Sequence, residues 1–168
     1  ELMQRAHALA HPVDYLLRAR HNRCLPQGGK LWETTLASAP LGEVSFTLPA
    51  RPRQSARAVS QTLHVCSVPL PDGQGGTLVV TCLIAREAGT PAGHKPIEWR
   101  LLTNRRITNL AEAAELIGWY RCRWEIETLF HVLKNGCRVE ALQLGEIKKL
   151  EVALAIYLVV AWRLAHLV

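Results

Sequence analysis

Hydrophobic and polar positions at the start of the chain predict a short helix followed by a strand. Apolar residues recur on one side of Glu1–Ala10, as in an amphipathic helix, and Pro12 ends that helix because proline cannot continue it. The apolar run Val13–Ala19 predicts a buried strand. The first helix begins without a capping residue or an initiating methionine, so we expect that a further segment precedes these 168 residues.

Residues 25–97 follow a different pattern, in which short alternating runs are separated by glycine and proline. Alternation of apolar and polar positions over a few residues is typical of strands, and the residues between the runs are typical of turns. We expect an antiparallel, β-rich insertion within an α/β domain. Its predicted strands are Lys30–Leu36, Gly42–Leu48, Arg57–Val68 and Thr77–Arg86.

The remaining residues, 98–168, predict one strand followed by helices. Glu98–Thr103 has the pattern of a strand. Asn109, with Glu112 three residues later, predicts the start of a helix, because both side chains can satisfy backbone N–H groups of the first turn. The helical pattern continues, straight or with a bend at a glycine, through Trp119–Lys134.

A final helix is predicted from about Glu146 to Val168. It contains eleven consecutive apolar residues between Glu151 and Arg163. A helix needs roughly 20 apolar residues to cross a bilayer, so this run is too short. We therefore expect a buried helix and no membrane partner.

Four polar side chains of the predicted helix fall on one face. At about 100° per residue, with Tyr120 at zero, Arg123 lies at about 300°, Glu127 at about 340° and Lys134 at about 320°. They share an arc of about 60° at the border of the apolar stripe. A carboxylate among cations suits the binding of a phosphate together with a divalent metal. The alternative is a solvated helix face on which Arg123 and Glu127 form an ordinary i,i+4 ion pair.

The spacing of these four residues, Tyr-x2-Arg-x3-Glu-x6-Lys, resembles the catalytic-helix signature of bacterial insertion-sequence transposases of the DDE superfamily. All four positions match, and Trp124 and the run Leu133–Glu140 are also similar to that family. The resemblance implies the C-terminal half of a ribonuclease H-like α/β fold, in which a central mixed sheet has helices on both sides. It also implies Mg²⁺-dependent cut-and-paste DNA transposition, by phosphodiester hydrolysis and strand transfer at transposon ends.

The resemblance gives each residue of the row a role. Glu127 would be the catalytic carboxylate and metal ligand, with Mg²⁺ as the cofactor and Mn²⁺ as its substitute, because hard cations prefer oxygen ligands. Arg123 and Lys134 would bind phosphate, and Tyr120 would donate its hydroxyl to the same group. Double-stranded DNA at transposon ends is the implied partner, and a homodimer in a synaptic complex is compatible with the family.

Further DNA contacts are expected outside the row. Trp99 opens its strand 21 positions before Tyr120, where the family stacks a tryptophan on a flipped base; the alternative is ordinary core packing. Trp124 and His131, on the signature helix itself, are also expected to contact DNA.

Basic residues give a second reason to expect a polyanionic partner. The chain has 20 lysines and arginines against 14 acidic residues, a net charge of +6. Arg18 and Arg20 follow the first predicted strand, and we expect them to contact the phosphate backbone; the alternative is a basic loop without a ligand. The five cysteines lack zinc-like spacing, which is typical of reduced thiols in the cytosol. The family resemblance further implies a bacterial, DNA-associated protein.

The aspartates depart from the family pattern. The family uses two aspartates together with the glutamate, and the sequence contains only Asp14 and Asp72. Asp14 opens the strand after the first helix, at a non-catalytic family position, and Asp72 lies in a Pro-Asp-Gly turn. We therefore expect weak metal binding and no strand cleavage by this chain alone. A non-catalytic DNA-binding remnant and an interaction module that docks through its apolar C-terminal helix remain the alternative functions.

Overall fold

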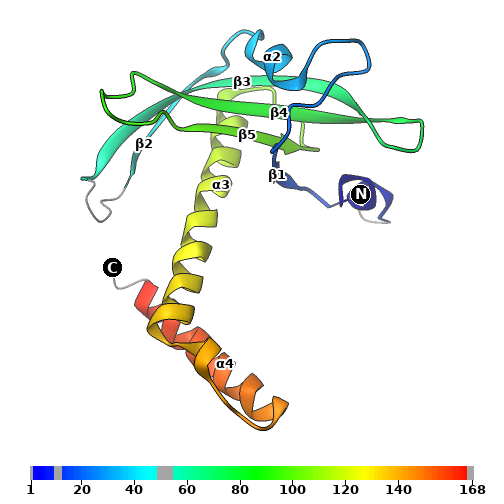
Figure 1. Cartoon of the computed structure of the whole chain (residues 1–168). Coiled ribbons are helices and arrows are strands. Elements are labelled where there is room, and N and C mark those ends of the chain that lie inside the picture. The colour runs from blue at the N-terminus through cyan, green and yellow to red at the C-terminus, as the bar shows by residue number, and fades with distance from the viewer. Residues whose placement is uncertain (1, 10–12, 49–54, 166–168) are drawn as a thin grey trace. The chain divides into compact units, whose positions relative to one another are not determined.

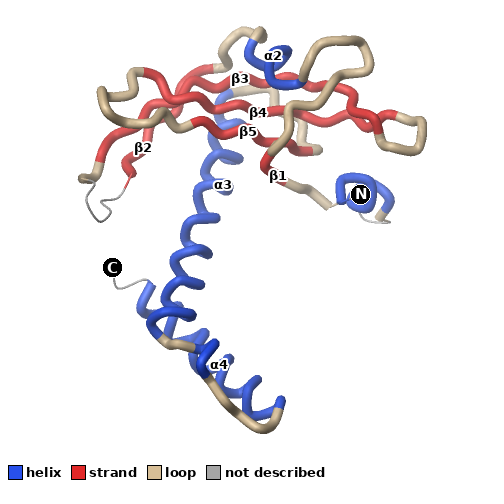
Figure 2. The backbone as a smooth tube through the Cα atoms, in the orientation of Figure 1, coloured by secondary structure: helices blue, strands red, loops and turns tan. Residues whose placement is uncertain are grey.

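The structure is a computed structural model that describes residues 2–9, 13–48 and 55–165 (Figure 1). The chain divides into two compact units, Glu1–Ile117 and Gly118–Val168. The first unit is built around a β-sheet, and the second is helical (Figure 2).

A five-stranded sheet forms the first unit, with strand order β1-β5-β4-β3-β2. Each of its four pairings is antiparallel. The long hairpin of β3 and β4 provides the centre, and the three-residue β1 lies at one edge. The strands are β1 (Leu16–Arg18), β2 (Gly42–Leu48), β3 (Arg57–Pro71), β4 (Thr77–Ala88) and β5 (Glu98–Thr103).

Both faces of the sheet are covered, which explains why the middle of β4 is apolar without alternation. All six residues of Val80–Ala85 are buried, as expected for a strand packed on two sides. On one face, Cys82 and Ile84 belong to a core cluster that includes Leu31 of helix α2 (Leu31–Leu36). Figure 1 shows α2 and the start of α3 on opposite sides of the sheet.

The other face packs against the first two turns of α3 (Leu110–His131). Ala113, Leu116 and Ile117 are buried there. The side chain of Leu110 lies so close to Gly42 that a Cβ at this glycine would come within 2.8 Å of Leu110 Cδ2. A side chain at Gly42, the first residue of β2, would therefore require Leu110 to move.

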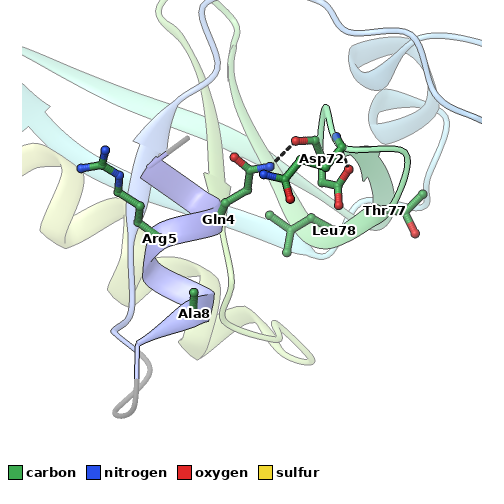
Figure 3. Close-up of a pocket in the computed structure, with 7 residues that line it drawn as sticks. Gln4, Arg5, Ala8, Asp72, Thr77 and Leu78 are labelled. Carbon is green, nitrogen blue, oxygen red and sulfur yellow. Dashed lines mark hydrogen bonds between the residues drawn. The ribbon is translucent and has the colours of Figure 1, made fainter.

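Helix α1 (Leu2–Ala8) meets the tip of the β3–β4 hairpin. Gln4 Nε2 donates a hydrogen bond to the backbone carbonyl of Asp72, next to a depression of about 530 Å³ (Figure 3). The Asp72 carboxylate accepts hydrogen bonds from the backbone N–H groups of Gln74 and Gly76, both at 2.8 Å. Asp72 thus serves the turn, as its Pro-Asp-Gly context predicts.

The second unit consists of the rest of α3, two short helical turns and a final helix. The turns are the π-helix η1 (Val132–Gly136) and the 3-10 helix η2 (Val139–Ala141), and α4 (Ile147–Ala165) packs against η1. Leu133 and Ala161 are buried in this unit. No helix in the part of the chain that the structure describes is long and apolar enough to span a membrane.

Most of the predicted elements are confirmed, but several predictions are wrong. The buried strand predicted at Val13–Ala19 covers only Leu16–Arg18, and these three residues are half-buried or exposed. Lys30–Leu36, predicted as a strand, contains helix α2: the side-chain oxygen of Asn22 accepts the Trp32 N–H at 3.0 Å, and its amide binds Glu33. The final helix is at the predicted place, but the prediction that it is buried is wrong for side chains such as Val152 and Ile156, which are exposed.

The sheet also differs from the mixed arrangement that the resemblance implied. Every pairing among the described strands is antiparallel, and the strands predicted as an insertion continue the same sheet as β1 and β5. A mixed α/β architecture with a five-stranded antiparallel sheet is therefore what these residues form.

Candidate nucleic-acid interface

The helix that carries the signature row starts with the predicted cap. Asn109 Oδ1 accepts the Glu112 N–H at 3.0 Å, and Glu112 Oε2 accepts the Thr108 N–H at 2.7 Å and its hydroxyl at 3.1 Å. These contacts, led by the Thr108 N–H, hold the pKa of Glu112 below its usual value. The reciprocal pair satisfies backbone donors that the first turn leaves unpaired, and it fixes the start of α3.

Three residues of the row meet on α3 as the helical period predicts. The Arg123 guanidinium donates a hydrogen bond to the Glu127 carboxylate, four residues later. The same guanidinium carbon lies 5.5 Å from the centroid of the Tyr120 ring, within the range of a cation–π contact. Tyr120 is buried, whereas the side chains of Arg123 and Glu127 are 42% and 50% exposed. A charged pair is thus presented to solvent beside a buried aromatic ring.

Lys134 does not continue this row on a regular helix. We predicted an α-helix through Lys134, but α3 ends at His131 and a π-helical turn follows, closed by a hydrogen bond of 2.9 Å from Cys137 N to Val132 O. A π-turn holds more residues than an α-turn, so the angle of about 320° for a straight helix does not apply. Lys134 Nζ instead pairs with Glu140 Oε1 at 2.7 Å.

Glu140 was not assigned a role from the sequence. It lies on η2, six residues after Lys134, outside the i,i+3 and i,i+4 positions at which helical pairs are found. Arg138, between them, has φ 52° and ψ 38°, a left-handed conformation that is uncommon for a residue other than glycine. This reversal of the backbone lets Glu140 reach back to Lys134, and no local sequence rule signals it.

The carboxylates in the described residues do not form a metal site. Within residues 2–9, 13–48 and 55–165, no three His, Cys, Asp or Glu side chains are placed to hold a metal ion. Asp14 faces Arg105, with 3.9 Å between Oδ2 and Nε, and Asp72 is used in its turn. Glu127, paired with Arg123, is a single carboxylate. By itself this donor set does not fit the several oxygen ligands that Mg²⁺ requires.

A basic depression of about 680 Å³ lies where β1 ends beside β5. Arg18 and Arg20, both predicted to contact DNA, line it and are exposed. The backbone continues the strand pairing here, since Ala19 N donates to Arg100 O at 2.7 Å. The remaining lining residues are Lys95, Pro96, Glu98 and Arg100. Arg18 and Arg20 are thus brought together with two cations that the sequence did not associate with them.

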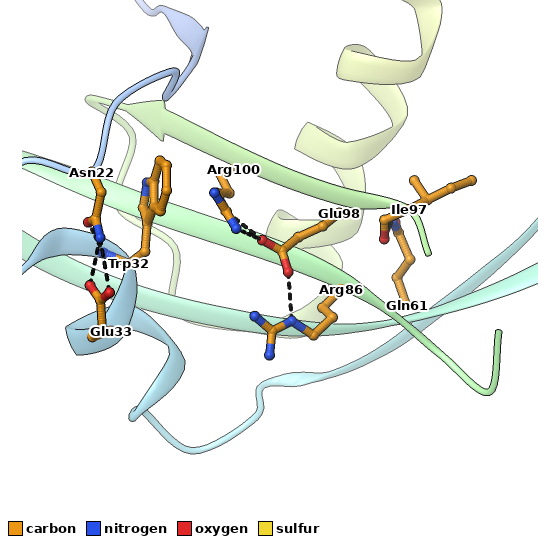
Figure 4. A network of polar contacts seen from close by, with 8 residues as sticks. All are labelled: Asn22, Trp32, Glu33, Gln61, Arg86, Ile97, Glu98 and Arg100. Atoms are coloured by element: carbon orange, nitrogen blue, oxygen red, sulfur yellow. Dashed lines mark hydrogen bonds and ion pairs between the residues drawn. The ribbon is translucent and has the colours of Figure 1, made fainter. Parts of the chain in front are cut away.

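A chain of polar contacts holds Arg100 in this depression (Figure 4). Glu98 accepts hydrogen bonds from Arg100 and, at 2.7 Å, from Arg86 Nε. Burial raises the pKa of the Glu98 carboxyl, but the two arginines outweigh that effect and hold the pKa below its usual value. The Arg100 guanidinium also lies 3.7 Å above the Trp32 ring. Arg100 is therefore fixed from two sides, by a carboxylate and by an aromatic face.

The other predicted contact residues are placed separately. Trp99 is 9% exposed and stacks on Phe46, with 5.4 Å between ring centroids and 13° between planes. Its base-stacking role stays a prediction, as does the DNA contact of His131, the exposed last residue of α3. The side chain of Trp124 lies outside the described part of the structure.

The comparison with known families agrees with the resemblance seen in the sequence. A family model described as the transposase DDE domain matches residues 5–163, which is nearly the whole chain and includes both units. The match includes the signature helix and the residues of the basic depression. The chain therefore belongs to the family of transposases with a DDE domain.

Proposed function

We propose that this chain takes part in cut-and-paste DNA transposition, by binding the phosphodiester backbone at a transposon end through the Tyr120–Arg123–Glu127 row. The observation that carries the proposal is the Arg123–Glu127 pair, which α3 presents to solvent beside a buried tyrosine ring. A guanidinium that already donates to a carboxylate keeps further N–H donors, which can bind phosphate oxygens. Membership of the transposase DDE domain family makes DNA the expected substrate.

Glu127 is proposed as the one carboxylate that this chain supplies to a Mg²⁺-dependent site. Glu127 would be one ligand of such a site, and the bound metal would supply stabilisation of negative charge on the reacting oxygens. Arg123 orients Glu127 through their hydrogen bond, and the Tyr120 ring lies 5.5 Å from the guanidinium carbon. Lys134, which pairs with Glu140 outside the row, is proposed as a further phosphate-binding cation. We place no metal in the described residues, because a single carboxylate does not fit one.

The isolated chain is accordingly proposed to bind DNA without cutting it. Asp14 and Asp72, the two aspartates of the sequence, are engaged with Arg105 and with the hairpin turn. The alternative function, a non-catalytic DNA-binding module, is favoured by the same observation. Both readings require salt-sensitive DNA binding, and only complementation by further carboxylates would produce cleavage.

We infer a ribonuclease H-like fold, of which residues 1–24 and 98–168 are core elements and residues 25–97 an insertion. A homodimer in a synaptic complex, and DNA contacts by Trp99, Trp124 and His131, follow from the same resemblance. Because Phe46 covers one face of the Trp99 ring, a flipped base would have to stack on the opposite face or displace Phe46.

The test compares the wild-type chain with Glu127→Gln and Arg123→Gln on a duplex that carries the element's terminal inverted repeat. Binding is measured in EDTA across a salt series, and nicking is measured with Mg²⁺. Glu125→Gln is the matched control, since Glu125 is an exposed glutamate on the same helix outside the row.

We expect salt-sensitive binding that Arg123→Gln weakens several-fold and Glu125→Gln leaves unchanged, with no nicking by the wild-type chain. Nicking that disappears with Glu127→Gln would show that another carboxylate completes the site, and the proposed inactivity would be wrong. Absence of binding at 50 mM salt, with the wild-type chain folded, would refute the proposed function.

A further inference from the structure

The basic depression at the end of β1 is formed by two separate segments of the sequence, residues 18–20 and 95–100. Arg18 and Arg20 leave β1, Lys95 belongs to the loop before β5, and Arg100 comes from β5 itself. Residues about 75 positions apart therefore place four cationic side chains around one depression of about 680 Å³. Only the folding of the sheet brings these side chains together, and none of them belongs to the Tyr120–Arg123–Glu127 row.

Charge in the depression is not balanced by the protein. The four cations face one carboxylate, Glu98, which leaves a formal lining charge of four minus one, or +3. In the described part of the chain, Arg18, Arg20 and Lys95 have no ion-pair partner. The two oxygens of Glu98 already accept hydrogen bonds from Arg86 and Arg100.

Like charges brought into one depression repel each other, and an anion placed among them removes that cost. One of these cations, Arg100, is also held in place for a ligand with several acceptor oxygens. Arg100 is held by Glu98 on one side and by the Trp32 ring, 3.7 Å away, on another, so little side-chain freedom is lost when its remaining donors bind. A phosphate group, with several acceptor oxygens and negative charge, fits this arrangement.

We propose that this depression is a second DNA-phosphate site, in which Lys95 and Arg100 act together with Arg18 and Arg20 and in which Glu98 and Trp32 position Arg100. The proposal rests on the proposed function, since DNA is taken as the source of the phosphate. It adds Lys95 and Arg100 as binding residues, and Glu98 and Trp32 as positioning residues, on the sheet unit. The chain then binds the duplex backbone through both of its units.

The experiment measures duplex binding by the full chain in EDTA, as a function of salt, for Lys95→Gln and Lys95→Glu. Lys95 is exposed and has no ion-pair partner among the described residues, so we expect its replacement to leave the fold intact. Lys148→Gln and Lys148→Glu are the matched controls, because Lys148 is an exposed lysine on α4 and gives the same changes in net charge. Arg20→Gln tests the other side of the depression.

Each phosphate contact contributes about 0.9 to the slope of log affinity against log salt, so we expect Lys95→Gln and Arg20→Gln each to lower the slope by about that amount. Lys95→Glu should weaken binding more than Lys95→Gln, while both Lys148 variants keep the wild-type slope. Equal effects at Lys95 and Lys148 would mean that only net charge matters, and the site would be refuted.

Two further outcomes separate this proposal from its premises. One outcome is that the wild-type chain binds duplex DNA and that Arg123→Gln weakens this binding, while the Lys95 and Arg20 variants bind like the wild type. In that case the second site is wrong and the proposed function stands. Titration with inorganic phosphate provides the other arm. Phosphate binding is monitored by the NMR chemical shifts of Lys95 and Arg100. If free phosphate saturates the depression and duplex DNA does not reproduce its chemical-shift changes, the site binds a free anion and the DNA proposal is wrong.

Discussion

Glu87 offers the sharpest test of how the sheet is held together. Its side chain is 2% exposed and accepts hydrogen bonds from Arg57 Nη1, from Arg57 Nη2 at 3.0 Å and from the Ile97 N–H at 2.8 Å. One carboxylate thereby ties β3, β4 and the segment before β5. Glu87→Gln keeps the size of the side chain but replaces one acceptor oxygen by an NH₂ group that must face a donor.

The magnitude follows from the burial of the pair. Breaking a fully buried ion pair by removing one partner costs about 3–5 kcal/mol, because the remaining charge is left without compensation. The Arg57 side chain is 15% exposed and regains some hydration. We therefore expect Glu87→Gln to lower the free energy of unfolding by about 2–3 kcal/mol at pH 7, below the range for a fully buried pair.

Acidic pH should reduce the difference in unfolding free energy between the wild type and Glu87→Gln. The hydrogen bonds from Arg57, opposed by burial and assisted by the Ile97 N–H, hold the pKa of Glu87 below its usual value. A group whose pKa is lowered on folding contributes stability above its unfolded-state pKa, about 4.3 for glutamate, and loses that contribution as the pH falls through the folded-state pKa. The gap between wild type and Glu87→Gln should thus be largest at neutral pH and shrink in acid.

Urea unfolding of the full chain between pH 7 and pH 3, followed by circular dichroism, measures both effects. Glu43→Gln is the control, because Glu43 is an exposed glutamate on β2 and its replacement should change stability by less than about 0.5 kcal/mol. A Glu87→Gln variant as stable as the control at pH 7, or a gap that stays constant down to pH 3, would refute the reasoning.

Two further predictions concern the helix cap and the thiols. Asn109→Ala removes the acceptor of the Glu112 N–H and should lower the free energy of unfolding by about 1 kcal/mol, measured by urea unfolding; no change would show that the cap does not stabilise α3. Burial raises the pKa of the Cys82 thiol to about 11, so iodoacetamide at pH 8 should alkylate the exposed Cys24 and Cys122 and spare Cys82 until the chain unfolds; peptide mass spectrometry showing early Cys82 labelling would contradict this.

The sequence was sufficient to predict contacts between residues within about one helical turn of each other. The cap of α3 needs Asn109 and Glu112 three residues apart, and the row needs Arg123 and Glu127 four residues apart. The helical period alone determines such contacts, so they could be predicted from the spacing of residue types. The strands β2, β3 and β4 were predicted within a few residues for the same reason, because their period of two is local.

Prediction failed where a distant residue changes the local preference. Helix α2 forms in a segment that we predicted as a strand, with Asn22, ten residues earlier, accepting the Trp32 N–H and binding Glu33. The pairing of Lys134 with Glu140 depends on a left-handed Arg138. Neither arrangement has a period that a sequence can display, because each depends on a hydrogen bond or ion pair that reaches beyond a helical turn.

The sequence by itself thus determined the helix cap, the charged row and the membership of a transposase family that the row indicates. Only the tertiary structure decided that Arg18 and Arg20 share a depression with Lys95 and Arg100, and that Trp99 is stacked on Phe46. The physical reason is the register of the sheet. Antiparallel pairing of β1 with β5 and of β5 with β4 fixes which distant residues become neighbours, and that choice is made by burial of both sheet faces together.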